Sequence, residues 1–373
     1  MSTVNRRSFL QKAGITTTAA LLASIVQPAW SRHLRASLRE GECVAPGDLA
    51  SEEDFWNYIQ QSFTTPTNLI NLNNGGVSPA PRIVQEAMKS NYDFSNEAPS
   101  YNMWRLLDSG RENLREGLAR LAGTSPEEIA INRNTSEGLE TVVFGLPLKR
   151  GDEVVACRQD YPNMINAWRQ RELRDGIRLL WVNLQLPSED EDYLVRQYVS
   201  AFTPQTKVVH LTHMINWNGQ ILPVRKIADE AARRGIQVIV DGAHTLAQIR
   251  FRVPDLGADY FASSLHKWLY APIGVGMLYV KQARIKELYP LFACDNPYKN
   301  DIRKFEHLGT RPFYIEQAVN KALEFHDLIG AERKEARLHY LKNYWMERVK
   351  NVPNVSLHTS MDRKWGCAIG LVS

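Results

Sequence analysis

An acidic side chain and an amine follow two consecutive apolar segments of this sequence. Residues 236–240 are typical of a β-strand that ends at Asp241, and residues 260–262 form a second apolar run that precedes Lys267. Ligands of sheets built from βαβ units bind beyond the carboxyl ends of the strands, so we expect both side chains to face one site. Taken singly, an Asp at a strand end often caps a turn and a lone Lys is usually solvated. The pairing is what indicates chemistry.

This pairing suits pyridoxal 5'-phosphate (PLP). The cofactor withdraws electrons while its ring nitrogen is protonated, which a nearby carboxylate achieves, and a lysine amine binds its aldehyde as a Schiff base. A lysine whose pKa is depressed by burial and by neighbouring positive groups can also move protons. We therefore predict Lys267 and Asp241 as the catalytic residues and PLP as the cofactor.

A phosphorylated cofactor also needs an anion site, and residues 132–138 could supply it. Thr135 and Ser136 offer hydroxyls and free backbone N–H groups at a predicted helix start, where anions bind readily. The alternative is an ordinary helix N-cap followed by an acidic first turn.

These motifs resemble those of the class V aminotransferases, PLP enzymes of fold type I, and most of all the isopenicillin N epimerase-like and cysteine desulfurase-like branch. The resemblance covers residues 70–331. Within it, residues 264–267 (Ser-Leu-His-Lys) match the motif of the lysine that carries the cofactor, and residues 241–244 match the Asp-Gly-Ala-x turn. It implies that Asp241 contacts the pyridine nitrogen and that Lys267 carries PLP.

The resemblance implies further cofactor contacts. Ser264 and His266, with Thr135 and Ser136, would contact the phosphate, and His244 would lie near the phenolate oxygen or the phosphate. As alternatives, both histidines could be buried core residues.

Three more positions are assigned by the same resemblance. Tyr161 would stack on the cofactor ring, Asn216 would hydrogen-bond its O3′ atom, and Thr310 would reach the phosphate of a neighbouring subunit, which makes the enzyme a homodimer. Residues 73–76 (Asn-Asn-Gly-Gly) resemble a substrate loop. A loop anchor and simple turns are the alternatives at these positions.

The elements that must position these residues follow an α/β pattern. From about residue 130, β-rich runs alternate with helical patterns, which predicts a mainly parallel central sheet flanked by helices. We expect a large PLP-binding domain over residues 70–310 and a smaller α/β domain over 311–373, with segment 32–69 packing on it. That smaller domain should begin with long amphipathic helices and end in a strand over 367–372. Because the family continues further, we expect it to be C-terminally incomplete.

Composition excludes several classes of protein. The chain has 373 residues, and its net charge of +4 comes from interleaved charges, which gives nucleic-acid binding no support. Its 4 cysteines never stand at CxxC spacing, so a structural zinc site is not expected, whereas one or two disulfides stay open. Cys367 is expected to be buried rather than to act as a sulfur-accepting nucleophile.

The N-terminus carries a targeting pattern. Arg6 and Arg7 precede an apolar run over 13–26, and residues 29–31 (Ala-Trp-Ser) could be a cleavage site. This predicts a twin-arginine signal peptide over residues 1–31, and hence a periplasmic or secreted protein that uses the twin-arginine export machinery. An uncleaved anchor is the alternative, but the run is short for a bilayer, so we expect no stable membrane insertion.

Together these patterns predict an enzyme that acts at the α-carbon of an amino-acid substrate, in the manner of an epimerase or an aminotransferase. A cysteine desulfurase or β-lyase is one alternative. The other is a catalytically idle PLP-fold protein that binds a ligand or a partner.

Overall fold

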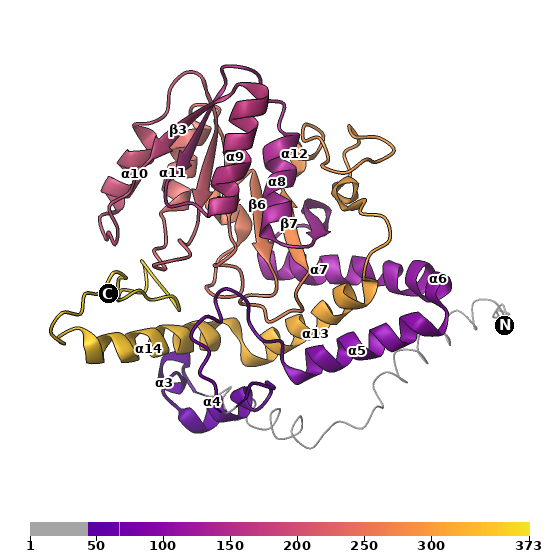
Figure 1. The fold of residues 1–373 in the computed structure, drawn as a ribbon, viewed down its shortest axis with the longest axis vertical. Helices are drawn as coiled ribbons and strands as arrows, with labels where there is room; N and C mark the ends of the chain where they lie inside the picture. The colour runs from indigo at the N-terminus through magenta and orange to yellow at the C-terminus, as the bar shows by residue number, and fades with distance from the viewer. Residues whose placement is uncertain (1–43, 67) are drawn as a thin grey trace, which may run out of the picture.

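Seven strands pair into one sheet in the part of the chain that the computed structural model describes, residues 44–66 and 68–373 (Figure 1). The predicted signal over residues 1–31 lies outside this part. The strands are β1 (Ile129–Asn132), β2 (Glu153–Cys157), β3 (Arg178–Val182), β4 (Thr206–Thr212), β5 (Gln237–Asp241), β6 (Tyr260–Ser264) and β7 (Gly276–Val280). Their order across the sheet is β1-β7-β6-β5-β4-β2-β3.

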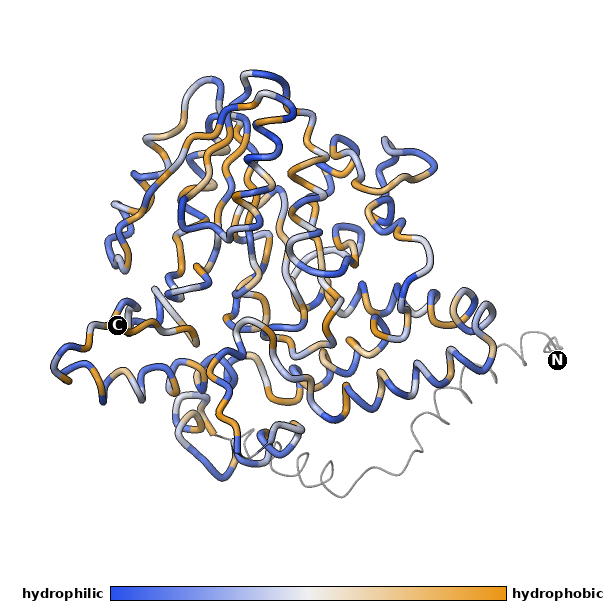
Figure 2. The backbone as a smooth tube through the Cα atoms, in the orientation of Figure 1, coloured by the Kyte–Doolittle hydropathy of each residue, from blue (hydrophilic) through white to orange (hydrophobic). Residues whose placement is uncertain are grey.

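The sheet is parallel except at β7, which runs antiparallel to both β6 and β1. Strands β2, β6 and β7 are buried along their whole length, as expected where helices cover both faces of a sheet. In Figure 2 these central strands are largely hydrophobic. The predicted fold class, a mainly parallel sheet flanked by helices, is confirmed.

Helices connect and cover the strands. In the first half of the chain they are α3 (Pro46–Leu49), α4 (Glu53–Gln60), α5 (Arg82–Glu97), α6 (Pro99–Tyr101), the π-helix η2 (Asn102–Leu107), the 3₁₀ helices η3 (Asp108–Gly110) and η4 (Pro126–Glu128), α7 (Arg111–Ala122), α8 (Thr135–Gly145) and α9 (Pro162–Asp175). In the second half they are α10 (Glu191–Val199), α11 (Val224–Ala232), α12 (Gln282–Ile285), α13 (Phe313–Ile329), α14 (Ala331–Val349) and the 3₁₀ helices η5 (Val253–Leu256) and η6 (Ile302–Glu306).

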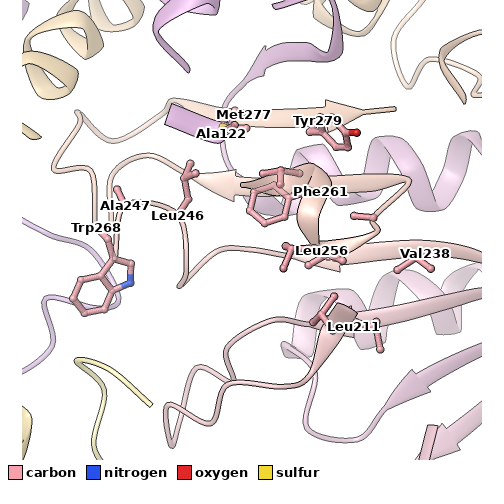
Figure 3. Packing of buried hydrophobic residues seen from close by; sticks show 14 of the residues in the cluster. Ala122, Leu211, Val238, Leu246, Ala247, Leu256, Phe261, Trp268, Met277 and Tyr279 are labelled. Atoms are coloured by element: carbon pink, nitrogen blue, oxygen red, sulfur yellow. The ribbon is translucent and has the colours of Figure 1, made fainter. Parts of the chain in front are cut away.

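Two apolar layers sandwich the sheet. On one face, α8 and α9 pack their buried side chains against one set of alternating strand residues, such as Val208 and Ala262. On the other face, α7, α11 and α13 pack against the alternate set, such as Val209 and Phe261. Figure 3 shows Phe261 of this second layer among Leu246, Leu256 and Met277. Because successive residues of a strand point to opposite faces, one sheet serves both layers.

The helices after the sheet run along the lower half of the molecule in Figure 1. Helix α13 packs on α5, and α14 packs on α3. Apolar side chains of α4, such as Trp56, cluster with Phe325 and Ile329 of α13, and Glu53 forms an ion pair with Arg337 of α14 at 2.7 Å. The N-terminal segment, from residue 44 onward, thus rests on the C-terminal helices.

The prediction of a strand over residues 367–372 is wrong. In this stretch only an isolated bridge between Leu357 and Val372 forms. The backbone N–H of Ala368 donates to the side chain of Gln248 at 2.9 Å, and that of Leu371 donates to the Thr359 hydroxyl at 2.8 Å. These side chains satisfy backbone groups that a ladder would otherwise pair.

None of the helices built from residues 44–66 and 68–373 combines the length and apolar character that crossing a bilayer requires.

Candidate active site

Asp241 and Lys267 lie at the same edge of the sheet. Asp241 is the last residue of β5 and pairs in register with Ala262 of β6, and Lys267 follows three residues after β6 ends. The turn after β5 depends on Gly242, because a Cβ there would lie 1.9 Å from the Phe261 ring. Parallel strands and this close packing bring the two segments to one place.

The Asp241 carboxylate is buried beneath this edge. The side chain is 4% exposed, and its Oδ1 atom accepts a hydrogen bond from the backbone N–H of Ala243 at 2.9 Å. Burial raises the pKa of Asp241, while the Ala243 N–H and the positive charge of Lys267 act in the opposite direction. The acid and the amine therefore share one electrostatic environment.

The Lys267 amine contacts His244. Its Nζ atom lies 3.0 Å from Nε2 of His244. Burial lowers the pKa of Lys267, with the Asp241 charge opposing the shift. Burial and the nearby Lys267 charge lower the pKa of His244 to about 3, so this imidazole is neutral at physiological pH.

The loop that carries Lys267 is held from two sides. Gly75 packs against the Trp268 ring, and the backbone N–H of Ser78 donates to the carbonyl of His266 at 2.9 Å.

Tyr270 adopts a left-handed backbone conformation with φ of 62°, which costs a non-glycine residue about 1–3 kcal/mol. Such strain persists only where surrounding packing enforces it, and the Lys334 amine lies 4.0 Å from the centre of the Tyr270 ring.

Thr135 and Ser264 meet at the start of helix α8. The backbone N–H of Thr135 donates to the Ser264 hydroxyl at 2.9 Å, and the two hydroxyls lie 2.8 Å apart. Ser136 stands in the first turn of the same helix. The helix approaches β6 closely at Gly138, where a Cβ would lie 2.8 Å from the Ala262 side chain. Hydroxyls and a helix N-terminus are thus gathered two residues before His266, in the manner of an anion site.

The remaining predicted residues lie in surrounding loops. Tyr161 follows β2 at the N-cap of α9 and is 40% exposed. Asn216 lies half-buried in the loop after β4, and Thr310 is exposed between η6 and α13. No hydrogen bond or ion pair among the described residues joins these three side chains to Lys267 or Asp241, so their roles toward the cofactor stay predictions.

The structure adds two groups that the sequence interpretation missed. Asp160 is 5% exposed, and its carboxylate accepts hydrogen bonds from the Thr212 hydroxyl and the Cys157 backbone N–H, both at 2.7 Å. Burial, with a smaller contribution from the Asp241 charge, raises the pKa of Asp160 to about 7. Its position just after a buried strand was a usable signal, because the rule that selected Asp241 applies equally to it.

The second missed group is Trp268, together with Lys334, which hydrogen-bonds to its carbonyl. The indole N–H of Trp268 donates to Nδ1 of His244 at 3.4 Å, and the Trp268 carbonyl accepts a hydrogen bond from Lys334 of α14. The adjacency of Trp268 to Lys267 was visible in the sequence. The contact with Lys334, which comes from a distant helix, was not.

The residues of the candidate site, from Thr135 to Lys267, lie in a stretch of the chain that matches a known protein family. The model of the family described as aminotransferase class-V matches residues 70–369. The chain belongs to the aminotransferase class-V family. It is accordingly a PLP-dependent enzyme of this family.

Individual class-V proteins show similarity over most of the chain. The isopenicillin N epimerase of Streptomyces clavuligerus is 27% identical over 321 residues, which cover 82% of this chain and 80% of that protein. A probable cysteine desulfurase of Halalkalibacterium halodurans is 28% identical over 312 residues, or 79% of this chain and 76% of that protein. A C-DES mutant with glycine covalently linked to its PLP cofactor superposes with a TM-score of 0.75 at 23% identity, covering 84% of each chain. This last likeness shows the shared fold.

The class-V residues present here fit PLP. Nδ1 of His266 is buried without a hydrogen-bond partner among the described residues, and His266 follows Ser264 by two residues. An unpaired buried polar atom is costly, and an acceptor such as a phosphate oxygen would satisfy it. Asp241 and Lys267 lie near each other at the same edge, where they would serve the ring nitrogen and the aldehyde.

Proposed function

We propose that this protein transforms an amino acid at its α-carbon, in the manner of an epimerase or an aminotransferase. The observation that carries the proposal is the convergence of the Asp241 carboxylate and the Lys267 amine in one buried environment. When bound, PLP would take up the electron pair left as a bond to the substrate α-carbon breaks.

The chain's own residues would do the rest. Thr135, Ser136, Ser264 and His266 would bind the phosphate, and Asp241 would keep a proton on the ring nitrogen. Lys267, with its pKa lowered by burial, would be a free base able to remove or return the α-proton. The Gly75 segment, packed on Trp268, would help to exclude water from this proton transfer.

An amino-acid panel tests the proposal. The protein loaded with PLP is incubated in deuterium oxide with each amino acid, and α-deuterium exchange, keto acid, sulfide and alanine are followed together. Exchange with inversion supports an epimerase, and keto acid supports an aminotransferase. Absorbance of the lysine-bound cofactor that every amino acid leaves unchanged, without exchange, would instead support an idle cofactor-binding protein.

Desulfuration is the second candidate, because cysteine desulfurases are among the relatives. In that case a thiol must accept sulfur, yet Cys367 is 0% exposed and burial raises its pKa, which disfavours the reactive thiolate. Release of alanine from cysteine, with sulfide formed when a thiol reductant is added, would nevertheless favour a desulfurase that works without Cys367, whereas release of sulfide and pyruvate would favour a β-lyase.

We propose, further, that the enzyme is a homodimer in which Thr310 reaches the neighbouring cofactor. Support comes from the exposure of Thr310 and from large apolar side chains that are more than 60% exposed, which contact with a second subunit would remove from water. They include Leu69, Ile70, Leu72, Tyr101, Ile273 and Tyr298.

Subunit mixing tests the dimer. Lys267→Ala and Thr310→Arg each inactivate their own homodimer in this proposal, but mixed dimers contain one intact site and regain activity. A monomeric mass by light scattering, or no recovery on mixing, would contradict it.

We also propose export through the twin-arginine machinery to the periplasm or the outside of the cell, supported by Arg6, Arg7 and the apolar run over 13–26. A reporter fused after Ser31 should be exported, and conversion of both arginines to lysine should retain it in the cytoplasm. Retention of the unaltered fusion in the cytoplasm would refute the proposal.

A further inference from the structure

The rings of His244 and Trp268 lie next to each other, edge to face, and His244 contacts the Lys267 amine. Trp268 is 7% exposed, and its ring centre lies 6.4 Å from that of His244 at an interplanar angle of 65°. Gly75 covers both rings, because a Cβ added there would lie 3.4 Å from the Trp268 ring and 3.9 Å from Cε1 of His244. The pair is therefore shielded, and its hydrogen bonds are made within the protein.

The direction of these hydrogen bonds follows from chemistry. An indole N–H can only donate, so Nδ1 of His244, 3.4 Å from Nε1 of Trp268, must accept. A neutral imidazole with an accepting Nδ1 carries its proton on Nε2. That N–H faces Nζ of Lys267 at 3.0 Å, and an amine can accept a hydrogen bond only when it is uncharged.

We propose that Trp268 is a positioning residue that fixes the tautomer of His244 and thereby keeps the free amine of Lys267 in its uncharged, nucleophilic form. The inference deepens the proposed function, on which it rests for the role of Lys267. Among the described residues, no hydrogen bond joins the Trp268 indole to the Lys267 amine, so Trp268 acts through His244.

The other groups around Lys267 do not supply this effect. The Asp241 charge favours the ammonium form of Lys267. His266 is a second imidazole whose pKa is lowered chiefly by burial, but no hydrogen bond joins it to the amine among the described residues. Lys334 anchors the Trp268 carbonyl from behind and so holds the indole in place.

The tautomer can be measured directly on the full chain freed of cofactor. Nitrogen-15 NMR of histidine-labelled protein distinguishes the two neutral tautomers, and the His244 signals are assigned by their loss in His244→Gln. We expect the Nε2–H tautomer in the wild-type protein and its partial or complete conversion to the Nδ1–H form in Trp268→Phe. An Nδ1–H tautomer in the wild-type protein overturns the proposal, whether or not the variant folds.

Trp168→Phe is the matched control. Trp168 is also a buried tryptophan, at 1% exposure, but its indole N–H has no hydrogen-bond partner among the described residues. The control therefore removes the same atoms from the core without touching the contact with His244, and the His244 signals should not change. A change of equal size in both variants would assign the effect to general loosening and refute the role of Trp268.

A second measurement follows the amine itself. Reductive methylation of Lys267, quantified by peptide mass spectrometry across a pH series, reports the uncharged fraction of the amine. Trp268→Phe should slow methylation about fivefold below the titration midpoint, the factor that one neutral hydrogen bond provides, and should move the midpoint to higher pH. Equal rates in Trp268→Phe and wild type contradict the proposal.

These two outcomes are independent of turnover. If the amino-acid panel shows no reaction while the tautomer and the methylation rate respond as expected, the proposed function fails and the role of Trp268 stands. If turnover is found but neither measurement responds, the reverse holds.

Discussion

Glu306 is the centre of a buried ionic cluster that ties the start of the phosphate element to the helices around it. It is 5% exposed, and its carboxylate accepts hydrogen bonds from Arg115 at 2.5 and 3.0 Å and from the backbone N–H of Ile131 at 2.6 Å. It also pairs with Arg111 at 3.0 Å. Ile131 lies in β1, four residues before Thr135, so this cluster fixes the strand that leads into the phosphate element.

The change Glu306→Gln keeps the shape of the side chain but removes its charge. Arg111 and Arg115 then lose the buried carboxylate that they share and keep only Glu316 and Glu112 as ion-pair partners. Breaking a buried ion pair in this way costs about 3–5 kcal/mol. We expect a loss of that size in the free energy of unfolding, together with weaker PLP binding because β1 is less firmly held.

The matched control is Glu112→Gln. Glu112 contacts the same Arg115 at 3.2 Å, but its side chain is 50% exposed. A pair so exposed contributes about 0–1 kcal/mol, because water solvates both charges and competes with the contact. The two variants thus change partners of one arginine, and they differ in burial and in the second arginine of each carboxylate, Arg303 for Glu112 and Arg111 for Glu306.

Urea unfolding followed by tryptophan fluorescence and circular dichroism measures both variants, and PLP titration measures the effect on the site. The expectation is a large loss for Glu306→Gln and a small one for Glu112→Gln. Equal losses, or a loss below about 1 kcal/mol for Glu306→Gln, would refute the argument that burial makes this cluster essential.

Three further outcomes are expected. Asp241→Asn should still bind PLP through Lys267 but slow α-deuterium exchange by roughly 100-fold; unchanged exchange would remove Asp241 from the mechanism. Burial lowers the pKa of Lys334 from 10.5 to about 7, so the unfolded chain binds more protons between these pH values and stability rises with pH there. The stability of Lys334→Met relative to wild type, from urea midpoints, should therefore be higher at pH 7 than at about pH 9, and a constant difference would show that Lys334 stays charged in the folded protein. Cys367→Ala should retain amino-acid turnover within about twofold, because a buried thiol with a raised pKa is inert; abolished sulfide release from cysteine would show the opposite.

The central pair of the site could be predicted from the sequence because its signals are local. Asp241 and Lys267 each follow an apolar strand, and the tendency of sequential strands to become neighbours places them at one edge. Thr135 was likewise predicted from its place at a helix start, and its partner Ser264 was supplied by the family motif.

The contacts that hold the Lys267 loop in place could not be predicted in this way. Lys334 lies on a helix with many charged residues, where an ammonium group is normally solvated, and only the folded chain shows that this position faces the Trp268 carbonyl. The strand predicted at 367–372 failed for a related reason. A strand requires a partner, and here the side chains of Gln248 and Thr359 satisfy the backbone instead.

The proposed chemistry depends most directly on the identity of the lysine that carries PLP. Borohydride reduction of the PLP-loaded protein, followed by peptide mass spectrometry, should place the reduced cofactor on Lys267 and on no other residue, and Lys267→Ala should lose both the label and the absorbance of the bound cofactor. A label on a different amine, such as the buried Lys334, or full retention of the bound-cofactor absorbance in Lys267→Ala, would contradict it.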